Sequence, residues 1–154
     1  MSQRVVAWGQ ELREVHKRLR EALGLARSAV QDGASGPTAV RDLQLYCIGF
    51  CAALTGHHRA EDATLFDVVL AAEPDLALVI ADLKRDHSML DQLLGELERG
   101  ARSGADRDEL LRHLDGIEAV METHFRFEEK KLVGVLDEAD RPEADKQKML
   151  GPLA

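Results

Sequence analysis

The chain has 154 residues, which is enough for a single domain with one hydrophobic core. Its content of 45% apolar and 31% charged residues is that of a globular protein in water. The net charge of −8, without a basic stripe, argues against nucleic acid as a partner. No apolar run approaches membrane-spanning length and the N-terminal sequence lacks a signal-peptide hydrophobic region, so we expect no membrane association and a cytoplasmic location.

Two amphipathic helices are predicted in the first half of the chain. Apolar residues recur every three or four positions over residues 3–31, and again from about residue 38 to 72. Residues 31–37, which contain glycine, serine and proline, are predicted to be the loop between them.

Two further helices are predicted in the second half. Pro74 suits the first turn of a third helix that continues to about residue 101. After a loop at 102–106, Asp106 is a candidate N-cap for a fourth helix that ends near Glu138.

The order and length of these helices predict an all-α fold. Four long helices with short connections favour an up-down-up-down antiparallel four-helix bundle. We expect residues 1–139 to form this bundle and residues 140–154 to form a charged C-terminal tail that is at best partly ordered. Bundles of this kind place cofactor sites in their cores, between facing helices.

One sequence pattern, His-x-x-x-Glu-x-x-x-Leu, occurs twice, and each copy is preceded by another histidine in a shared setting. The candidate ligands are, in chain order, His16, His57, Glu61, His87, His124 and Glu128. Four imidazoles and two carboxylates are enough to hold two transition-metal ions.

All six candidates lie on the apolar faces of their predicted helices. Positions i and i+4 point the same way, so Glu61 shares the face of His57. The four histidines also lie at matching depths in their helices, and antiparallel packing therefore brings them to one cross-section. Carboxylates buried without compensating charge would each cost on the order of several kcal/mol. An old duplication of a helical hairpin explains the repeated leucines but not two buried glutamates, so we predict a dinuclear metal site.

Other polar residues are interpreted as lying outside this site. His58 lacks a counterpart in the second half and is interpreted as peripheral. His113 lies three turns from the nearest ligand, too far to share a metal. Asp91, one turn after the third histidine, is an additional oxygen ligand or, as we favour, a hydrogen-bond acceptor or surface residue.

The cysteines and glycines have simpler interpretations. Cys47 and Cys51, four positions apart, are interpreted as core-packing residues of a reducing compartment rather than ligands of a soft metal. Glycines inside the predicted helices indicate either close helix packing or room for a small diatomic ligand; they are Gly49, Gly56, Gly116 and Gly134.

The chain from His16 to Glu128 resembles the hemerythrin-like, or HHE cation-binding, family. The most specific part is the His-x-x-x-Glu-x-x-x-Leu-Phe stretch that ends at Phe66. The resemblance implies two non-haem iron ions with an oxo or hydroxo bridge, zinc or manganese also being possible. It also implies that the four histidines are terminal ligands and that Glu61 and Glu128 are bridging ligands.

Two departures distinguish the chain from the oxygen-carrying hemerythrins. Their fifth histidine, near the third-helix histidine, is missing, because Leu83 and Asp91 hold those places. Their second bridge is an aspartate in His-x-x-x-x-Asp, a place held here by Glu129. The pattern is closer to bacterial hemerythrin-like proteins, including mycobacterial ones described as reacting with peroxide. Some of those use a tyrosine ligand, but Tyr46 lies three turns from the second-helix histidine.

The ligand count predicts a reactive centre for small molecules. Six protein groups cannot fill two octahedral shells, so we expect open positions for peroxide, O2 or NO. Three roles remain open: a diiron protein with catalase- or peroxidase-like activity, a non-enzymatic sensor or store of O2, NO or iron, and a structural zinc bundle. We assign no catalytic residues beyond the metal ligands, and the oligomeric state stays open.

Overall fold

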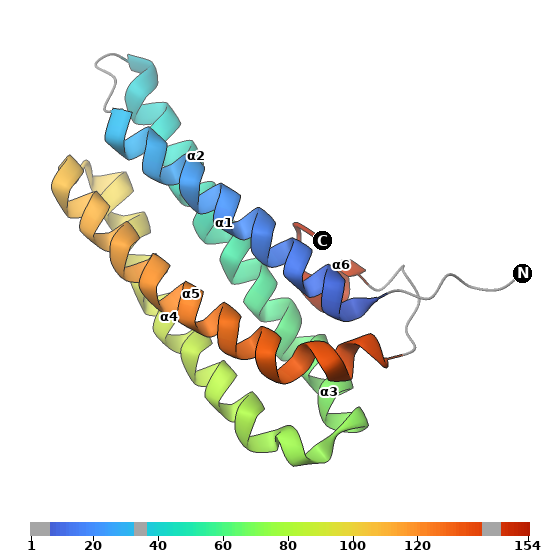
Figure 1. Ribbon diagram of the computed structural model, residues 1–154. Coiled ribbons are helices and arrows are strands. Elements are labelled where there is room, and N and C mark those ends of the chain that lie inside the picture. Colours follow the sequence, from blue (N-terminus) through green and yellow to red (C-terminus); the bar gives the residue numbers. More distant parts are fainter. Residues whose placement is uncertain (1–6, 33–36, 140–145) are drawn as a thin grey trace, which may run out of the picture.

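The computed structural model describes residues 7–32, 37–139 and 146–154. Four long helical rods dominate it, and neighbouring rods run antiparallel (Figure 1). They are α1 (Trp8–Asp32), α2 (Pro37–Ala60) with its continuation through η1 (Glu61–Leu65) and α3 (Phe66–Ala72), α4 (Ala77–Ser103) and α5 (Arg107–Asp137). A 3₁₀ turn η2 (Pro74–Leu76) precedes α4, and a short helix α6 (Lys146–Leu150) follows α5. The predicted all-α bundle is confirmed.

The four rods enclose one core. α1 contacts α2 and α5, and α4 contacts the same two helices, so that the rods form a closed ring. The buried residues of α1 recur every three or four positions, which is the stripe that an amphipathic helix turns toward a core. In chain order, the buried apolar residues of α1 are Trp8, Leu12, Val15, Leu19, Leu23, Ala26 and Val30.

The helix boundaries follow local signals. The Asp106 side chain accepts a hydrogen bond from the backbone N–H of Glu109 at 2.8 Å, which confirms it as the N-cap of α5. Gly104 ends α4 in the left-handed region, with φ of 76°. Most of the predicted first loop and the predicted start of the first helix, at residues 3–6, lie outside the described residues.

The second rod contains a π-helical turn that the sequence analysis does not predict. This turn, η1, begins at Glu61, in the middle of the bundle. A π-turn holds about one residue more than an α-turn, and such turns are frequent at functional sites. The next buried residues along this rod are Leu65, at the end of the turn, and Phe66.

The last described segment of the chain lies against the bundle. α6 contacts α2 and η1, and its Met149 and Leu150 are buried. Residues 146–154 therefore pack on the bundle, while residues 140–145 lie outside the described residues. Within the described part of the chain, no helix is both long and apolar enough to cross a membrane.

Candidate metal centre

The fold brings all six predicted ligands together in the core. None of these residues is more than 2% exposed. They come from every rod of the bundle: His16 from α1, His57 from α2, Glu61 from η1, His87 from α4, and His124 and Glu128 from α5. The predicted meeting of four histidines at one level is confirmed.

The ligand atoms form two groups that share one carboxylate. In each group they all lie within 4.8 Å of one another. The first group consists of His16, His57, Glu61 and Glu128. The second group consists of His58, Glu61, His87 and His124. Two neighbouring ions, rather than one, fit this arrangement.

The spacing of the atoms suits a metal ion. In the first group, His16 Nε2 lies 3.1 Å from Glu128 Oε1. In the second group, the Nε2 atoms of His87 and His124 lie 3.2 Å apart. Two neighbouring ligands at right angles on an ion, with bonds of about 2.1 Å, would be about 3 Å apart. The side chains therefore need little movement to coordinate.

Both glutamates lie between the two groups. Glu61 Oε1 is 3.4 Å from His57 Nε2 in the first group and 3.2 Å from His87 Nε2 in the second. Glu128 directs Oε1 to His16 and Oε2 to His124, whose Nε2 is 3.3 Å away. These are the positions from which a carboxylate can bridge two ions.

Several of the inward-facing atoms are buried without a hydrogen-bond partner among the described residues. They are Nε2 of His57, both ring nitrogens of His58, both carboxylate oxygens of Glu61 and Oε2 of Glu128. An unsatisfied buried polar group costs about 1–3 kcal/mol, so a cluster of them needs an explanation. Lone pairs that converge from histidine and carboxylate side chains fit cations such as iron, manganese or zinc.

Four histidines are oriented by acceptors outside the cluster. Each directs Nδ1 away from the centre and so leaves Nε2 turned inward, as ligand histidines commonly do. The acceptors are Glu129 for His16, the Leu150 carbonyl for His57, Asp62 for His87, each at 2.8 Å, and Asp86 for His124 at 3.0 Å. Sequence reasoning missed these roles, although an acidic residue directly follows the glutamate of both repeats, as Asp62 and Glu129.

Burial and mutual charge shift the pKa values of the clustered side chains. Burial, helped by the nearby His16, lowers the pKa of His57 to about 3. Burial also raises the pKa of Glu61 well above its ordinary value, and the neighbouring Glu128 adds to this shift. For Glu128, hydrogen bonds with His124 and His16 outweigh burial and hold the pKa well below its ordinary value. Cations between the two carboxylates would favour the ionised form of both.

The interpretation of His58 as peripheral is wrong. His58 is only 2% exposed and belongs to the second group. Its counterpart in the second repeat is Phe125, which is also buried and stacks on His16 at 3.8 Å between ring centroids. The apolar Phe125 at the matching position indicates that the helix face of His58 is turned toward the core. The helix α4 has no second histidine, as predicted, but His58 supplies a fifth imidazole from α2.

The other candidates lie outside both groups. Asp91 is exposed and lines a groove between α2 and α4. His113 lies within 3.8 Å of Glu109, near the start of α5. Cys47 and Cys51 are buried thiols whose pKa values burial raises to about 11 and about 12, which agrees with packing.

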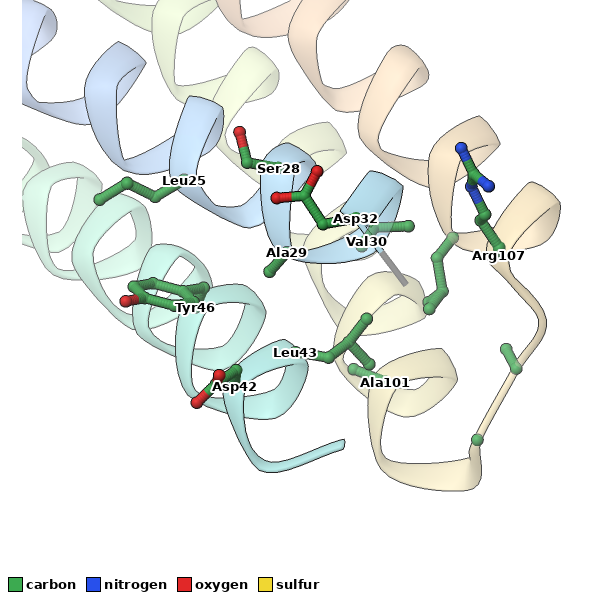
Figure 2. A pocket seen from close by; sticks show the side chains of 13 residues that line it. Leu25, Ser28, Ala29, Val30, Asp32, Asp42, Leu43, Tyr46, Ala101 and Arg107 are labelled. Carbon is green, nitrogen blue, oxygen red and sulfur yellow. The ribbon is translucent and has the colours of Figure 1, made fainter. Parts of the chain in front are cut away.

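The single tyrosine lies at the far end of the bundle. Tyr46 lines a cavity of about 540 Å³ near the end of α1 and the start of α5. Figure 2 shows it there beside Leu25 and Asp42, with Asp32 and Arg107 farther along the same cavity. No ligand of either group lines this cavity.

The helical glycines divide into two kinds. A Cβ atom on Gly56 would lie 2.8 Å from Pro152 Cδ, so close packing explains this glycine. At Gly49, Gly116 and Gly134 a Cβ atom would meet no atom of residues 7–32, 37–139 or 146–154 within 4 Å, so packing in this part of the chain explains none of these three.

Comparison with known proteins agrees with the geometry. A family model described as "Hemerythrin HHE cation binding domain" matches residues 10–136, which include every residue of both groups. Searches of curated proteins and of solved structures found no significant match. Because the family match covers most of the chain, the protein belongs to the hemerythrin HHE cation-binding domain family.

Proposed function

We propose that this protein binds two iron ions in the bundle core, and that the pair reacts with or binds a small oxidant such as peroxide, O2 or NO. The observation that carries the proposal is the pair of buried ligand groups that share Glu61, with unsatisfied atoms directed at their centres. All six residues predicted from the sequence would act as ligands, with Glu61 and Glu128 as bridges, and His58 would be a seventh.

The two ions would differ in their protein ligands. With both carboxylates bridging, the first ion has two imidazoles, from His16 and His57. The second ion has three, from His58, His87 and His124. Octahedral ions have six positions, so the first ion keeps more of them for a small external ligand. Bound iron or manganese would supply electrons to an oxidant, whereas zinc would not.

The surroundings favour a small inorganic ligand over an organic substrate. The ligand residues are at most 2% exposed, and none of them lines the larger cavities found between the described residues. The carboxylates outside the cluster hold the histidine rings, and the apolar core around them limits water.

Elemental analysis with an absorption spectrum, on protein purified without added metal, is the first test. We expect two iron ions per chain and absorption in the near ultraviolet and visible range. The double variant Glu61→Ala, Glu128→Ala should no longer bind two ions. A wild-type protein without metal, or a double variant that keeps both ions, would contradict the proposal.

Addition of peroxide to the oxidised iron-loaded protein distinguishes the roles. Sustained evolution of oxygen supports a catalase-like activity, and a single spectral change without turnover supports a sensor or a store. Zinc alone, without visible absorption, would instead identify a structural metal bundle and exclude the redox roles.

A further inference from the structure

We propose that residues 146–154, here called the C-terminal strap, position His57 and thereby control how firmly the first metal ion is held. This inference rests on the proposed dimetal site. It concerns a segment beyond the family match, which ends at residue 136.

The strap provides the hydrogen bond that orients His57. Nδ1–H of His57 donates to the backbone carbonyl of Leu150 at 2.8 Å, and both residues are buried. A carbonyl oxygen can only accept, so Nδ1 carries the proton and Nε2 presents its lone pair to the first group.

The repeat explains why His57 needs this acceptor. Its counterpart His124 donates to Asp86, the residue just before the third-helix histidine. The matching residue of the first half, just before His16, is Val15, a buried side chain without an acceptor atom. The strap therefore provides the hydrogen-bond acceptor for His57 from outside the repeat, whereas Asp86 provides the acceptor for His124 from within it.

Two glycines let the strap reach the backbone of α2. Gly151 has φ of 91°, and a Cβ atom there would lie 2.8 Å from both N and Cα of His57. A Cβ atom on Gly56 would lie 2.8 Å from Cδ of Pro152. A residue larger than glycine at position 151 is disfavoured by its backbone conformation and by the contact with His57.

The strap is also anchored to α1, which carries the other histidine of the first group. Nη1 of Arg18 donates to the carbonyl of Leu153 at 2.6 Å. Nζ of Lys146 lies 3.2 Å from Oε1 of Glu11. The strap thus holds α1 and α2 together beside His16 and His57. The histidines His87 and His124 of the second group are oriented by carboxylates on the bundle rods instead.

Release of zinc from the full-length protein tests whether the strap affects the first metal ion and not the second. The protein is loaded with two Zn²⁺ ions and mixed with an excess of chelator. We expect the Gly151→Val variant to release one ion about ten- to a hundredfold faster than wild type, because the loss of a partner that orients a ligand histidine typically lowers metal affinity by that factor and weaker binding speeds dissociation. The second ion should leave at the wild-type rate.

Gly104→Val is the matched control. Gly104 also has a positive φ, and no atom of the part of the chain that the structure describes lies within 4 Å of its added Cβ atom. This variant carries similar backbone strain far from the strap, and both ions should leave at the wild-type rate. Arg18→Ala, which frees the Leu153 carbonyl without backbone strain, should accelerate release of the same single ion to a smaller extent.

Nitrogen NMR of the histidine rings separates positioning from general stability. In the zinc-loaded wild type, His57 should show a hydrogen-bonded Nδ1–H, and this signal alone should change in Arg18→Ala. Unchanged release from Gly151→Val, or equal acceleration of both ions, would overturn the role of the strap while leaving the dimetal site intact. A wild-type protein that binds fewer than two ions would overturn the proposed function as well.

Discussion

The imidazole ring of His58 is stacked on that of His87, with ring centroids 3.9 Å apart and an angle of 13° between the planes. Phe125 is stacked on His16 in the same way, at 3.8 Å and 7°. The two stacks occupy matching positions of the repeat, but only His58 offers nitrogen atoms. This difference gives the second group three imidazoles and the first group two.

The variant His58→Phe should keep the stack and lose the ligand. We expect the affinity for one of two metal ions to fall at least about tenfold, because one imidazole of the second group is gone. Competition with a coloured chelator measures the two affinities. His113→Phe, outside both groups, is the control. Equal affinities in wild type and His58→Phe would show that His58 is not a ligand.

Removal of an orienting carboxylate should weaken the second ion without removing a ligand. Asp62 accepts from Nδ1 of His87 at 2.8 Å, and Asp62→Ala leaves that ring free to turn. The expected loss of affinity is about ten- to a hundredfold. Asp67→Ala, an exposed position on the following helix, should bind both ions as wild type does. A wild-type affinity for the second ion in Asp62→Ala would mean that packing alone holds the His87 ring in place.

Acid should destabilise the metal-free protein partly through His58. Burial, with the nearby His87 adding to it, holds the pKa of His58 well below 6.5 in the folded state, whereas the unfolded chain takes up the proton near pH 6.5. The unfolded state therefore binds more protons below that pH, and this contribution to stability is present above pH 6.5 and is lost as the pH falls. Between pH 7 and 5, one such histidine contributes up to about 2 kcal/mol to the loss.

Urea unfolding at both pH values, with chelator present, isolates that contribution. Metal-free His58→Phe should lose less of its unfolding free energy between pH 7 and 5 than wild type does. Burial likewise lowers the pKa of His57, while Glu128 and Asp86 outweigh burial and raise that of His124, so only the difference between the two proteins assigns the effect to His58. An identical loss in both would contradict a buried, neutral His58.

Loss of the N-cap of α5 should affect stability but not metal binding. The Asp106→Ala variant removes the 2.8 Å hydrogen bond to the N–H of Glu109, at a cost of about 1 kcal/mol in unfolding free energy. Urea denaturation measures the change, and the metal content should stay that of wild type because the cap lies at the far end of the bundle. Asp108→Ala, inside the first turn, is the control for the loss of charge.

Periodicity predicts the bundle and the six ligands because both depend on side chains at regular positions. His16 and Glu128, for example, stand in apolar stripes where a polar residue is conspicuous. The π-turn escapes this reasoning, because Leu65 and Phe66 are both apolar and either would suit a continuous helix. His58 is not predicted as a ligand because the second repeat has no histidine at the matching position.

The orienting contacts are harder to predict for a different reason. Asp62 and Asp86 are ordinary helix-surface residues by sequence, and their partners lie on other helices. The acceptor of His57 is a backbone carbonyl, an atom that every residue possesses. The residue type at position 150 does not indicate that its carbonyl accepts from His57. Only the three-dimensional path of the chain shows this contact.

Val15 and Asp86 hold matching positions of the two hairpins but differ in chemistry. The two halves of the bundle are therefore not equivalent. In a pair of two first hairpins, Val15 would hold the place of Asp86 in both copies, so neither His57 would have a carboxylate there. In a pair of two second hairpins, Phe125 would hold the place of His58 in both copies. Such a pair would offer only four imidazoles. Neither pairing would reproduce the ligand set of this centre, so the two hairpins are not interchangeable.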